Sequence, residues 1–308
     1  MAEPQFKVDF MRYAPVMLAL SGVLILVSIL SLAVRGLNFG IDFTGGTLVE
    51  VQYPAPVELQ AVEAGLMARG LKGAVVQYFG TRSEVLVRIP GNIVGSTGEI
   101  SSRVLDALHG ADLGKVTLQR VEFVGPQVGE ELVTSAALAL LYALLAIGAY
   151  VAFRFEYRFA IGAIVSLGHD AIVTVGFCSL IGLEFDLTVV AAVLTVIGYS
   201  INDTVVIYDR IRENFPRMRK ASTREIINRS VNETMTRTIA TTATVVLALL
   251  PLVLFGGDAI HSFSLAMLIG VVAGAYSTIY VASWSLLPTG LSAKDMLIPA
   301  KEGAHTTP

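Results

Sequence analysis

The sequence predicts a membrane-embedded all-α bundle of six transmembrane helices, with an α+β domain inserted between the first and second helix. Three observations lead to this fold class. Of the 308 residues, 54% are hydrophobic and 15% are charged, with a mean hydropathy of +0.68, whereas soluble domains carry about 25% charged residues. Six apolar stretches approach the roughly 20 residues that a helix needs to cross a bilayer. One stretch, residues 35–131, is too polar to cross and long enough to fold.

The apolar stretches define the expected membrane spans. They are residues 13–34, 132–153, 159–181, 187–208, 238–256 and 263–286. The first follows Lys7 and Arg12, as a secretory signal would, but it is longer than the roughly 7–15 apolar residues of a cleavable signal core. We therefore expect residues 1–12 to precede an uncleaved membrane anchor.

Basic residues predict the orientation of the spans, because Lys and Arg collect on the cytoplasmic side. Segment 209–237 holds eight arginines and lysines, and the turn at 154–158 holds two arginines. The connections near residues 184–186 and 256–261 hold none. We therefore expect both termini, the basic segment 209–237 and a flexible tail at 287–308 to be cytoplasmic, and the 35–131 domain to face outward.

The outward domain shows alternating strand patterns and helical patterns in turn. Strands are expected at 46–53, 74–79, 84–89 and 115–124, and helices at 56–70 and 97–110. The order βαββαβ predicts a ferredoxin-like sandwich. The segment shows no metal-ligand cluster, nucleophile constellation or phosphate-binding glycine pattern. We expect a binding or mechanical role for it, with no enzymatic activity, cofactor or metal.

Asp203 and Arg237 are the most informative charges within the spans. Counted from Asp209 at about 1.5 Å per residue, Asp203 lies about 9 Å inside the inner interface, and Arg237 lies about 6 Å inside when counted from Glu233. Ionisable residues in a membrane are rare and usually pair within the bundle. We interpret the two residues as a proton relay; the alternatives are a structural ion pair or an arginine that extends to the interface.

A proton relay would use the opposed effects of burial and counter-charge. Arginine does not deprotonate in proteins, so Arg237 would be a fixed positive charge. If the pair loosens during a conformational cycle, Asp203 can take up a proton, and if the pair re-forms, the proton is expelled. Moving one charge through 100 mV is worth about 2.3 kcal/mol, so such a relay could drive mechanical work.

Weaker relay candidates lie on three of the spans. They are Asp170 and His169 in the third, Asn202 in the fourth and Thr241 in the threonine-rich fifth. Neighbouring helix positions point about 100° apart, so Asp170 and His169 should not face the same partner squarely. The alternative for the polar residues is hydrogen bonding between helices. Gly198, Gly270 and Gly274 are expected to permit close helix packing.

Three other function classes remain open from the residues alone. An intramembrane protease would need a second carboxylate facing Asp203, or a Ser/His pair across spans. A purely structural subunit would tolerate Asp203→Asn. An exporter of small molecules or lipids would show substrate-selective export.

Five motifs carry a resemblance to a known family. They are "NFGIDFTGGT" (38–47), "VGPQVGEEL" (124–132), "GYSINDTVVIYDRIREN" (198–214), "TRTIATT" (236–242) and "SFSLAMLIG" (262–270). In this order, across residues 6–288, the chain resembles the smaller membrane subunit of the SecD–SecF family of bacterial protein-export factors, within the RND-like superfamily.

The resemblance implies half of an RND-type transporter that pairs with SecD in the bacterial cytoplasmic (inner) membrane. It implies work with the SecYEG channel and its SecA motor, and with YajC as a further partner, using protons to drive late steps of export of unfolded preprotein; nucleic acid is not expected. Asp203 and Arg237 match the family's essential intramembrane pair, and Asp170 matches a polar position of the third span. Gly40, Asp42, Gly45 and Gly46 form a structural motif, in which the glycines would make either a hinge or a tight strand entry.

Overall fold

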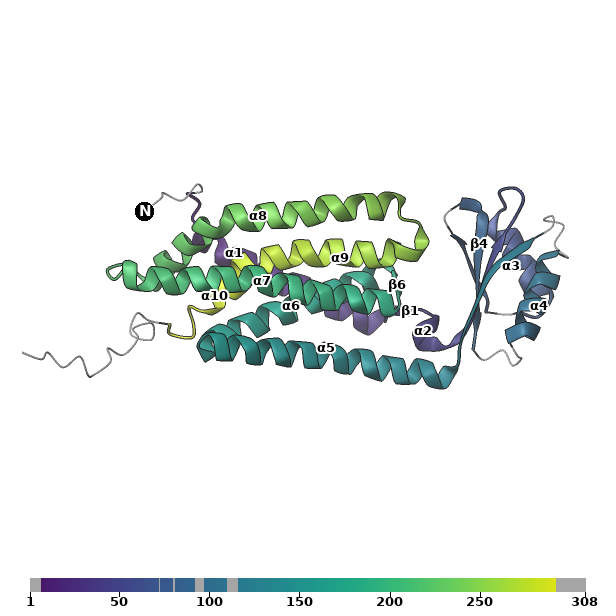
Figure 1. Cartoon of the computed structure of the whole chain (residues 1–308), viewed down its shortest axis with the longest axis horizontal. Coiled ribbons are helices and arrows are strands. Elements are labelled where there is room, and N and C mark those ends of the chain that lie inside the picture. The colour runs from purple at the N-terminus through teal and green to yellow at the C-terminus, as the bar shows by residue number, and fades with distance from the viewer. Residues whose placement is uncertain (1–6, 72, 80, 92–96, 110–115, 292–308) are drawn as a thin grey trace, which may run out of the picture.

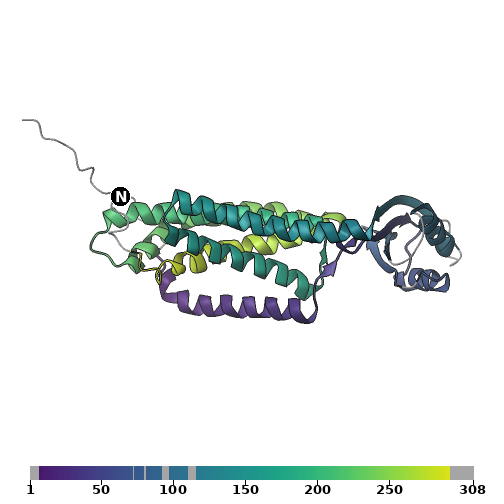
Figure 2. The same cartoon turned by 90° about the horizontal axis from the view of Figure 1, so that it is seen from below.

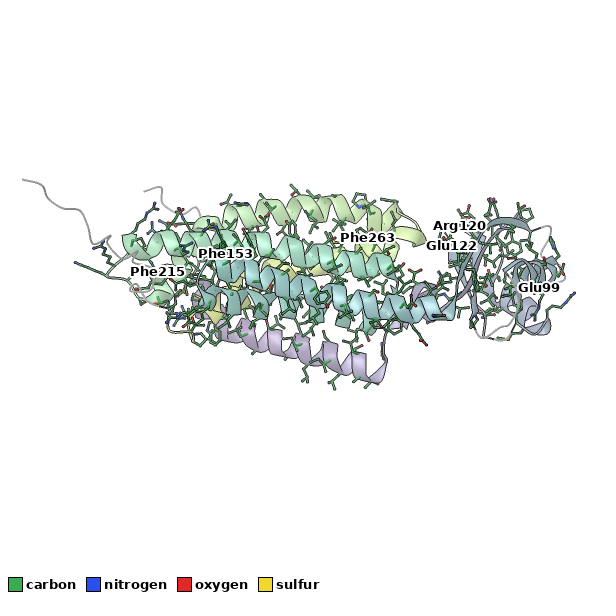
Figure 3. The ribbon with its side chains drawn as sticks, turned by 60° about the horizontal axis from the view of Figure 1, so that its bottom comes forward. Glu99, Arg120, Glu122, Phe153, Phe215 and Phe263 are labelled. Atoms are coloured by element: carbon green, nitrogen blue, oxygen red, sulfur yellow. The ribbon has the colours of Figure 1, made fainter. Side chains whose placement is uncertain are left out.

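The computed structural model describes residues 7–71, 73–79, 81–91, 97–109 and 116–291. They form a long helical bundle with a small sheet domain at one end (Figures 1 and 2). Figure 3 shows Phe215 toward the end of the bundle far from this domain, Phe263 toward the near end, and Arg120 and Glu122 in the domain itself. The described part of the N-terminal region lies at the far end (Figure 1).

Six helices among the described residues are long and apolar enough to cross a membrane. They are α1 (Phe10–Val34), α5 (Pro126–Arg154), α6 (Tyr157–Ile181), α7 (Leu187–Arg217), α8 (Thr223–Phe255) and α9 (Asp258–Ser277). Each overlaps one of the expected spans, and the last expected span, 263–286, extends past the end of α9. The expectation of a multi-pass membrane protein is supported, although α5 begins at Pro126 rather than at 132 because Pro126 suits the first turn of a helix.

The basic segment 209–237 is not a separate loop, as its composition had suggested. It consists of the end of α7, a short turn and the beginning of α8. Helix α8 begins with a capping box, in which the Ser222 side chain accepts from the Glu225 N–H and the Glu225 side chain accepts from the Ser222 N–H. Phe215 and Ile226 are buried in one core cluster beside the turn, so both helices continue past the apolar spans as a packed pair.

Helix α9 does not end the last span by itself. A π-helical turn, Thr278–Ala282, and a short helix α10, Ser283–Ser285, continue it. The Ser283 hydroxyl donates to the Thr278 carbonyl five residues earlier, at 2.9 Å. A π turn holds one extra residue, so the helix changes the face that it presents beyond Thr278.

The helices divide into a central and a peripheral set. Within the apolar stretch of each span, half of the residues are buried inside the protein in α6, α7 and α9, compared with 11–17% in α1, α5 and α8. Gly270 of α9 lies against Val196 of α7, and Gly274 lies against Ser200, which confirms the expected close packing at these two glycines. The expectation for Gly198 was wrong, because a Cβ built there has no neighbour within 4 Å. The candidate carboxylates lie on the central helices α6 and α7.

The sheet domain follows the expected order of strands and helices. It contains β2 (Gly46–Gln52), α3 (Leu59–Ala68), β3 (Val75–Phe79), β4 (Thr81–Pro90), α4 (Thr97–His109) and β5 (Thr117–Val124). The sheet order is β3-β4-β2-β5, and every pair is antiparallel. Alternate residues such as Val49 and Val87 are buried together with Leu66 of α3 and Val104 of α4. Strand β4 begins at Thr81, inside the expected turn, because Phe79 already pairs with Thr81.

Three short elements had no sequence prediction. They are β1 (Asn38–Phe39), α2 (Ile41–Thr44) and β6 (Glu184–Phe185). Strand β1 follows α1, β6 lies between α6 and α7, and the two pair in parallel. Elements of two to four residues are too short to show a hydrophobic period. They lie where the bundle meets the sheet domain (Figure 1).

Candidate functional site

Asp203 lies on α7 with its side chain turned into the protein. The residue is 3% exposed, and its Oδ1 atom makes no hydrogen bond within the described part of the chain. The charge of Arg237 and the hydroxyls of Thr241 and Thr238, all on α8, interact with its carboxylate. Buried carboxylates are normally paired or hydrogen-bonded because desolvation is costly. The carboxyl group of Asp203 is therefore only partly satisfied in this conformation.

Arg237 faces Asp203 but does not close an ion pair with it. No nitrogen–oxygen contact within 4 Å joins the two residues, although both are described, and the Arg237 side chain is exposed on α8. Arg237 also borders an open cleft of about 310 Å³ between α7 and α8. The cleft is lined by Val206, Asp209, Arg210, Glu213, Glu233, Thr234 and Arg237. The predicted pair is thus held apart, with its arginine at the rim of a polar cleft.

A cluster around Glu233 joins α7 and α8 next to this cleft. The Glu233 carboxylate accepts hydrogen bonds from Arg210 at 2.7 Å, Asn214 at 2.8 Å and Arg229 at 2.8 Å. Charge-assisted bonds of this kind are stronger than neutral ones. The bonds from Arg210 and Asn214 run from α7 to α8 and fix the spacing of the two helices one turn away from Arg237. In the sequence, the spacing of four residues between Arg229 and Glu233 on one helix could have indicated their ion pair.

Asp170 forms a second polar centre in the middle of the bundle. The residue is fully buried, and its Oδ2 atom accepts from the Ser200 hydroxyl of α7 at 2.6 Å. Its Oδ1 atom lies 3.0 Å from Nδ1 of His169, whose ring also packs beside Tyr276 of α9. As expected, Asp170 and His169 face different helices. They nevertheless contact each other, which the 100° separation had not suggested.

Other buried hydroxyls extend this centre between α6, α7 and α9. Ser166 donates to Ser277 at 3.0 Å, and the hydroxyls of Thr204 and Thr278 lie 3.0 Å apart. A Cβ at Gly274 would lie 3.5 Å from Asp170 Oδ2. The same Cβ would lie only 3.1 Å from the Ser200 side chain, so the absence of a side chain at Gly274 lets α9 approach α7 beside this carboxylate.

Of the weaker relay candidates, Asn202 does not join either centre, whereas Thr241 lies at the Asp203 site. Asn202 is exposed on α7, because one residue along a helix turns the side chain by about 100°. The Thr241 hydroxyl lies 3.0 Å from the Arg237 carbonyl and 3.1 Å from the Thr238 carbonyl of its own helix, and it also interacts with the Asp203 carboxylate. The residue that sequence reasoning missed is Ser200, whose hydroxyl donates to Asp170. Ser200 lies three residues from Asp203 on α7, a spacing that could have indicated it.

The glycine motif after α1 makes a tight strand entry rather than a free hinge. Gly45 and Gly46 have φ angles of 67° and 140°, which favour glycine. A side chain at Gly46 would collide with the carbonyl oxygen of Ile89, and one at Gly40 would lie 3.1 Å from Glu184 Oε1. Asp42 accepts a hydrogen bond from the Leu187 N–H at 3.0 Å. The motif therefore connects the sheet domain directly to α7.

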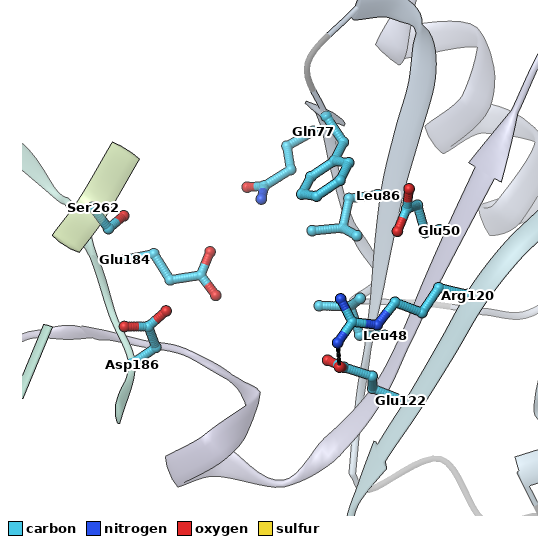
Figure 4. Close-up of a pocket in the computed structure, with 10 residues that line it drawn as sticks. Leu48, Glu50, Gln77, Leu86, Arg120, Glu122, Glu184, Asp186 and Ser262 are labelled. Carbon is cyan, nitrogen blue, oxygen red and sulfur yellow. Dashed lines mark hydrogen bonds and ion pairs between the residues drawn. The ribbon is translucent and has the colours of Figure 1, made fainter. Parts of the chain in front are cut away.

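A cleft of about 150 Å³ separates the sheet from the near end of the bundle (Figure 4). Arg120 and Glu122 line it from β5, and Glu184, Asp186 and Ser262 line it from the bundle. The described residues contain no group of three His, Cys, Asp or Glu side chains that could hold a metal ion. The cleft separates two bodies that are joined at one side through β1, α2 and β6.

Comparison with known proteins gives the same family along nearly the whole chain. The family described as protein export membrane protein SecD/SecF, C-terminal, matches residues 104–290, and the SecD/SecF GG motif matches residues 30–57. The protein translocase subunit SecF of Pseudomonas aeruginosa is 46% identical over 303 residues, which cover 98% of each chain. The corresponding subunit of Escherichia coli O157:H7 is 43% identical over 300 residues, with 96% and 93% covered.

Solved structures agree with this assignment. The crystal structure of SecDF from Thermus thermophilus, a translocon-associated membrane protein, superposes with a TM-score of 0.83 at 36% identity. SecDF in a super-membrane-facing form gives a TM-score of 0.70. The match covers 94% of this chain but 40% of those chains, so the chain spans less than half of the solved SecDF proteins. The chain belongs to the SecD/SecF family of protein export membrane proteins.

Proposed function

We propose that this chain is an accessory subunit of the bacterial Sec translocase that pairs with SecD and uses the proton gradient to drive late steps of preprotein export. In this proposal it lies in the cytoplasmic membrane with both termini and the basic helix ends inside. The four-stranded domain, which we interpret as a ferredoxin-like sandwich, lies outside. The names of its relatives, protein translocase subunits and a translocon-associated protein, support the export role.

One observation carries the proton-driven part of the proposal. Asp203 is almost fully buried, Oδ1 lacks a hydrogen bond among described residues, and its counter-charge Arg237 stands apart. A carboxyl group in such a place needs either a closed ion pair or a proton. We propose that it alternates between the two. Because Arg237 keeps its charge, each closure of the pair would release the proton bound to Asp203.

The polar cleft beside Arg237 supports a route for that proton to the cytoplasmic side. It opens among Asp209, Glu213 and Glu233. In the proposal, water in the cleft would exchange protons with the site when Arg237 swings away from it. The Asp170–His169–Ser200 centre would keep α6 and α7 in a fixed relative position while α7 moves relative to α8.

The proposal assigns partners without assigning an enzymatic activity. SecD would cover the exposed membrane faces, SecYEG and SecA would supply the preprotein, and YajC is a further candidate partner. A protease would need a carboxylate opposite Asp203. Asp170 instead accepts from Ser200 and contacts His169, while Asp203 faces Arg237.

Gradient-driven export in reconstituted vesicles tests the proposal. With SecD and the Sec channel present, Asp203→Asn should reduce gradient-stimulated export at least tenfold while assembly is retained. Arg237→Lys should also reduce it, because a lysine lacks the planar fork that matches a carboxylate. Asn202→Ala, one residue away and exposed, is the matched control and should export normally.

Two results would contradict the proposal. Full gradient-stimulated export by Asp203→Asn would make the carboxylate a packing residue. Gradient-driven efflux of a lipid or dye without any effect on preprotein would favour the RND-like exporter instead.

A further inference from the structure

The segment between α1 and β2 contacts both the bundle and the sheet domain. The Gly40 N–H donates to the Phe185 carbonyl at 2.9 Å, and the Asn38 side chain donates to the Gly182 carbonyl at 3.1 Å. These bonds hold β1 against β6, the strand that leads into α7. Helix α2, the next element, therefore lies beside the first turn of α7.

Asp42 of α2 binds the free end of α7. Its Oδ2 atom accepts from the N–H of Leu187, the first residue of that helix, at 3.0 Å. The first four N–H groups of a helix have no partner within the helix, and a carboxylate there is favoured by the helix dipole. Asp186 caps the same helix locally, through Val189 N–H at 2.9 Å. Two carboxylates thus serve one helix end, but only Asp42 comes from another element.

On its other side, α2 is connected to the sheet without slack. Gly45 ends α2, and Gly46 already begins β2. A side chain at Gly46 would collide with Ile89 of the neighbouring strand β4, so β2 leaves the turn in close contact with the sheet. Gly129 of α5 is equally close to α2, because a Cβ there would lie 2.6 Å from the Phe43 carbonyl oxygen.

A second contact ties the same two bodies together. Arg88 of β4 forms an ion pair with Glu184 of β6, and both side chains are mostly buried. The Arg88 guanidinium also donates to the Phe39 carbonyl at 3.4 Å. The sheet domain is therefore joined to the entrance of α7 through side chains as well as through the chain itself.

From these contacts we infer that Asp42 is a positioning residue that couples movement of α7 to movement of the sheet domain. Asp203 lies sixteen residues after Leu187, about 24 Å along the same helix. A displacement of α7 at the proton site reaches Leu187 through a continuous helix, Asp42 transfers it to α2, and Gly46 transfers it to the sheet. The inference rests on the proposed function, since it assumes that α7 moves when Asp203 changes its proton.

Distance measurement between the two bodies tests the inference. The full-length chain, reconstituted with SecD in vesicles, would carry spin labels on cysteines introduced at the exposed positions Met67 of α3 and Phe255 of α8. Cys178 is buried and would not compete for the label. Double electron–electron resonance would compare the label distance with and without an imposed proton gradient.

Two variants remove the same hydrogen bond from opposite sides. Asp42→Ala removes the acceptor. Leu187→Pro removes the donor while keeping the helix, because proline is favoured at the first helical position. We expect both to abolish the gradient-dependent change in label distance and to reduce gradient-stimulated export several-fold. Asp186→Ala removes a cap from the same helix end without cutting the bridge, and it should keep the distance change.

The outcomes separate this inference from the proposed function. If Asp42→Ala and Leu187→Pro respond to the gradient like the unmodified chain, the coupling role of Asp42 is wrong although the proton-driven function stands. An equal loss in Asp186→Ala would mean that helix capping matters rather than the bridge, and it would also overturn the inference. If the unmodified chain shows no change in label distance, the sheet domain does not follow the gradient and the inference is overturned, whereas the proton-driven function is judged separately by the export of Asp203→Asn. If Asp203→Asn keeps the distance change, the change does not depend on the proton site, and the inference is overturned as well.

Discussion

Asn232 of α8 binds the backbone of Val8 as a neighbouring strand would. Its Oδ1 atom accepts from the Val8 N–H at 2.9 Å, and its Nδ2 donates to the Val8 carbonyl at 2.8 Å. One side-chain amide thus satisfies both polar groups of a residue that precedes α1. The entrance of the first span is thereby attached to the N-terminal part of α8.

Substitution of Asn232 by Ala should release this attachment. The Val8 N–H would lose its acceptor, so amide hydrogen exchange at residue 8 should become at least tenfold faster, whereas the Val8 carbonyl would keep a second donor, the Asn228 side-chain amide at 3.3 Å. The cost in stability should be about 1–2 kcal/mol, as expected for two hydrogen bonds in a partly buried site. Hydrogen exchange by mass spectrometry measures the first effect. Asn202→Ala, an exposed asparagine, should change neither; unchanged exchange in Asn232→Ala would contradict the prediction.

Gly270 and Gly198 offer a matched pair for helix packing. A Cβ at Gly270 would lie within 2.8 Å of Cγ1 of Val196 and still closer to Cγ2, whereas a Cβ at Gly198 meets nothing within 4 Å. Gly270→Ala should therefore lower stability by about 1–3 kcal/mol through overpacking. Gly198→Ala should be neutral or slightly stabilising, because alanine favours helix. Thermal unfolding in detergent compares the two, and a double variant with Val196→Ala should recover part of the loss.

The Ser200 hydroxyl should stabilise the central helices by satisfying Asp170. Ser200→Ala leaves the buried Oδ2 atom of Asp170 without its donor at 2.6 Å, which should cost about 1–3 kcal/mol. Ser135→Ala changes the same group at an exposed position of α5 and serves as the control. Equal melting temperatures for the two variants would show that another group satisfies Asp170.

We expect ionisation of Tyr53 to lower the stability of the protein at high pH. Burial raises the pKa of Tyr53 to about 12, and its hydroxyl has no hydrogen-bond partner among the described residues. Because the unfolded tyrosine ionises near pH 10, the unfolded state loses its proton first. The free energy of unfolding should then fall between pH 10 and pH 12, by roughly 1.4 kcal/mol per pH unit at most.

The variant Tyr53→Phe should remove that part of the alkaline loss and leave stability at neutral pH nearly unchanged. Chemical unfolding of the detergent-solubilised chain at pH 9 to 12 measures both effects. Tyr142→Phe, at an exposed tyrosine, should keep the alkaline loss. If Tyr53→Phe loses stability as steeply as the unmodified chain, another group dominates the alkaline transition.

The number of spans and the order of the sheet domain could be predicted because both depend on long patterns. Apolar length identified six spans, and alternation identified the strands around Val49 and Val87. Counting residues along a helix also gives the depth of a residue in the membrane. It predicted similar depths for Asp203 and Arg237, which interact between α7 and α8.

The direction in which each side chain faces could not be predicted in the same way. Depth does not fix rotation about the helix axis, so Asn202 was placed beside Asp203 although it is exposed. Gly198 and Gly270 look alike in the sequence, but only Gly270 meets a neighbouring helix. The role of Asp42 depends on a partner 145 residues away. Such contacts arise from packing between helices, which a local pattern does not record.

The π-helical turn at Thr278–Ala282 has a consequence for anyone who compares this chain with its relatives. The extra residue rotates everything after it by about 100° relative to a continuous helix. A helical wheel drawn through residues 258–285 therefore assigns the wrong face to one of its halves. The last span is better treated as two phase-shifted segments, and an aligned relative that lacks one residue there would keep both contact faces by replacing the π turn with an ordinary α turn.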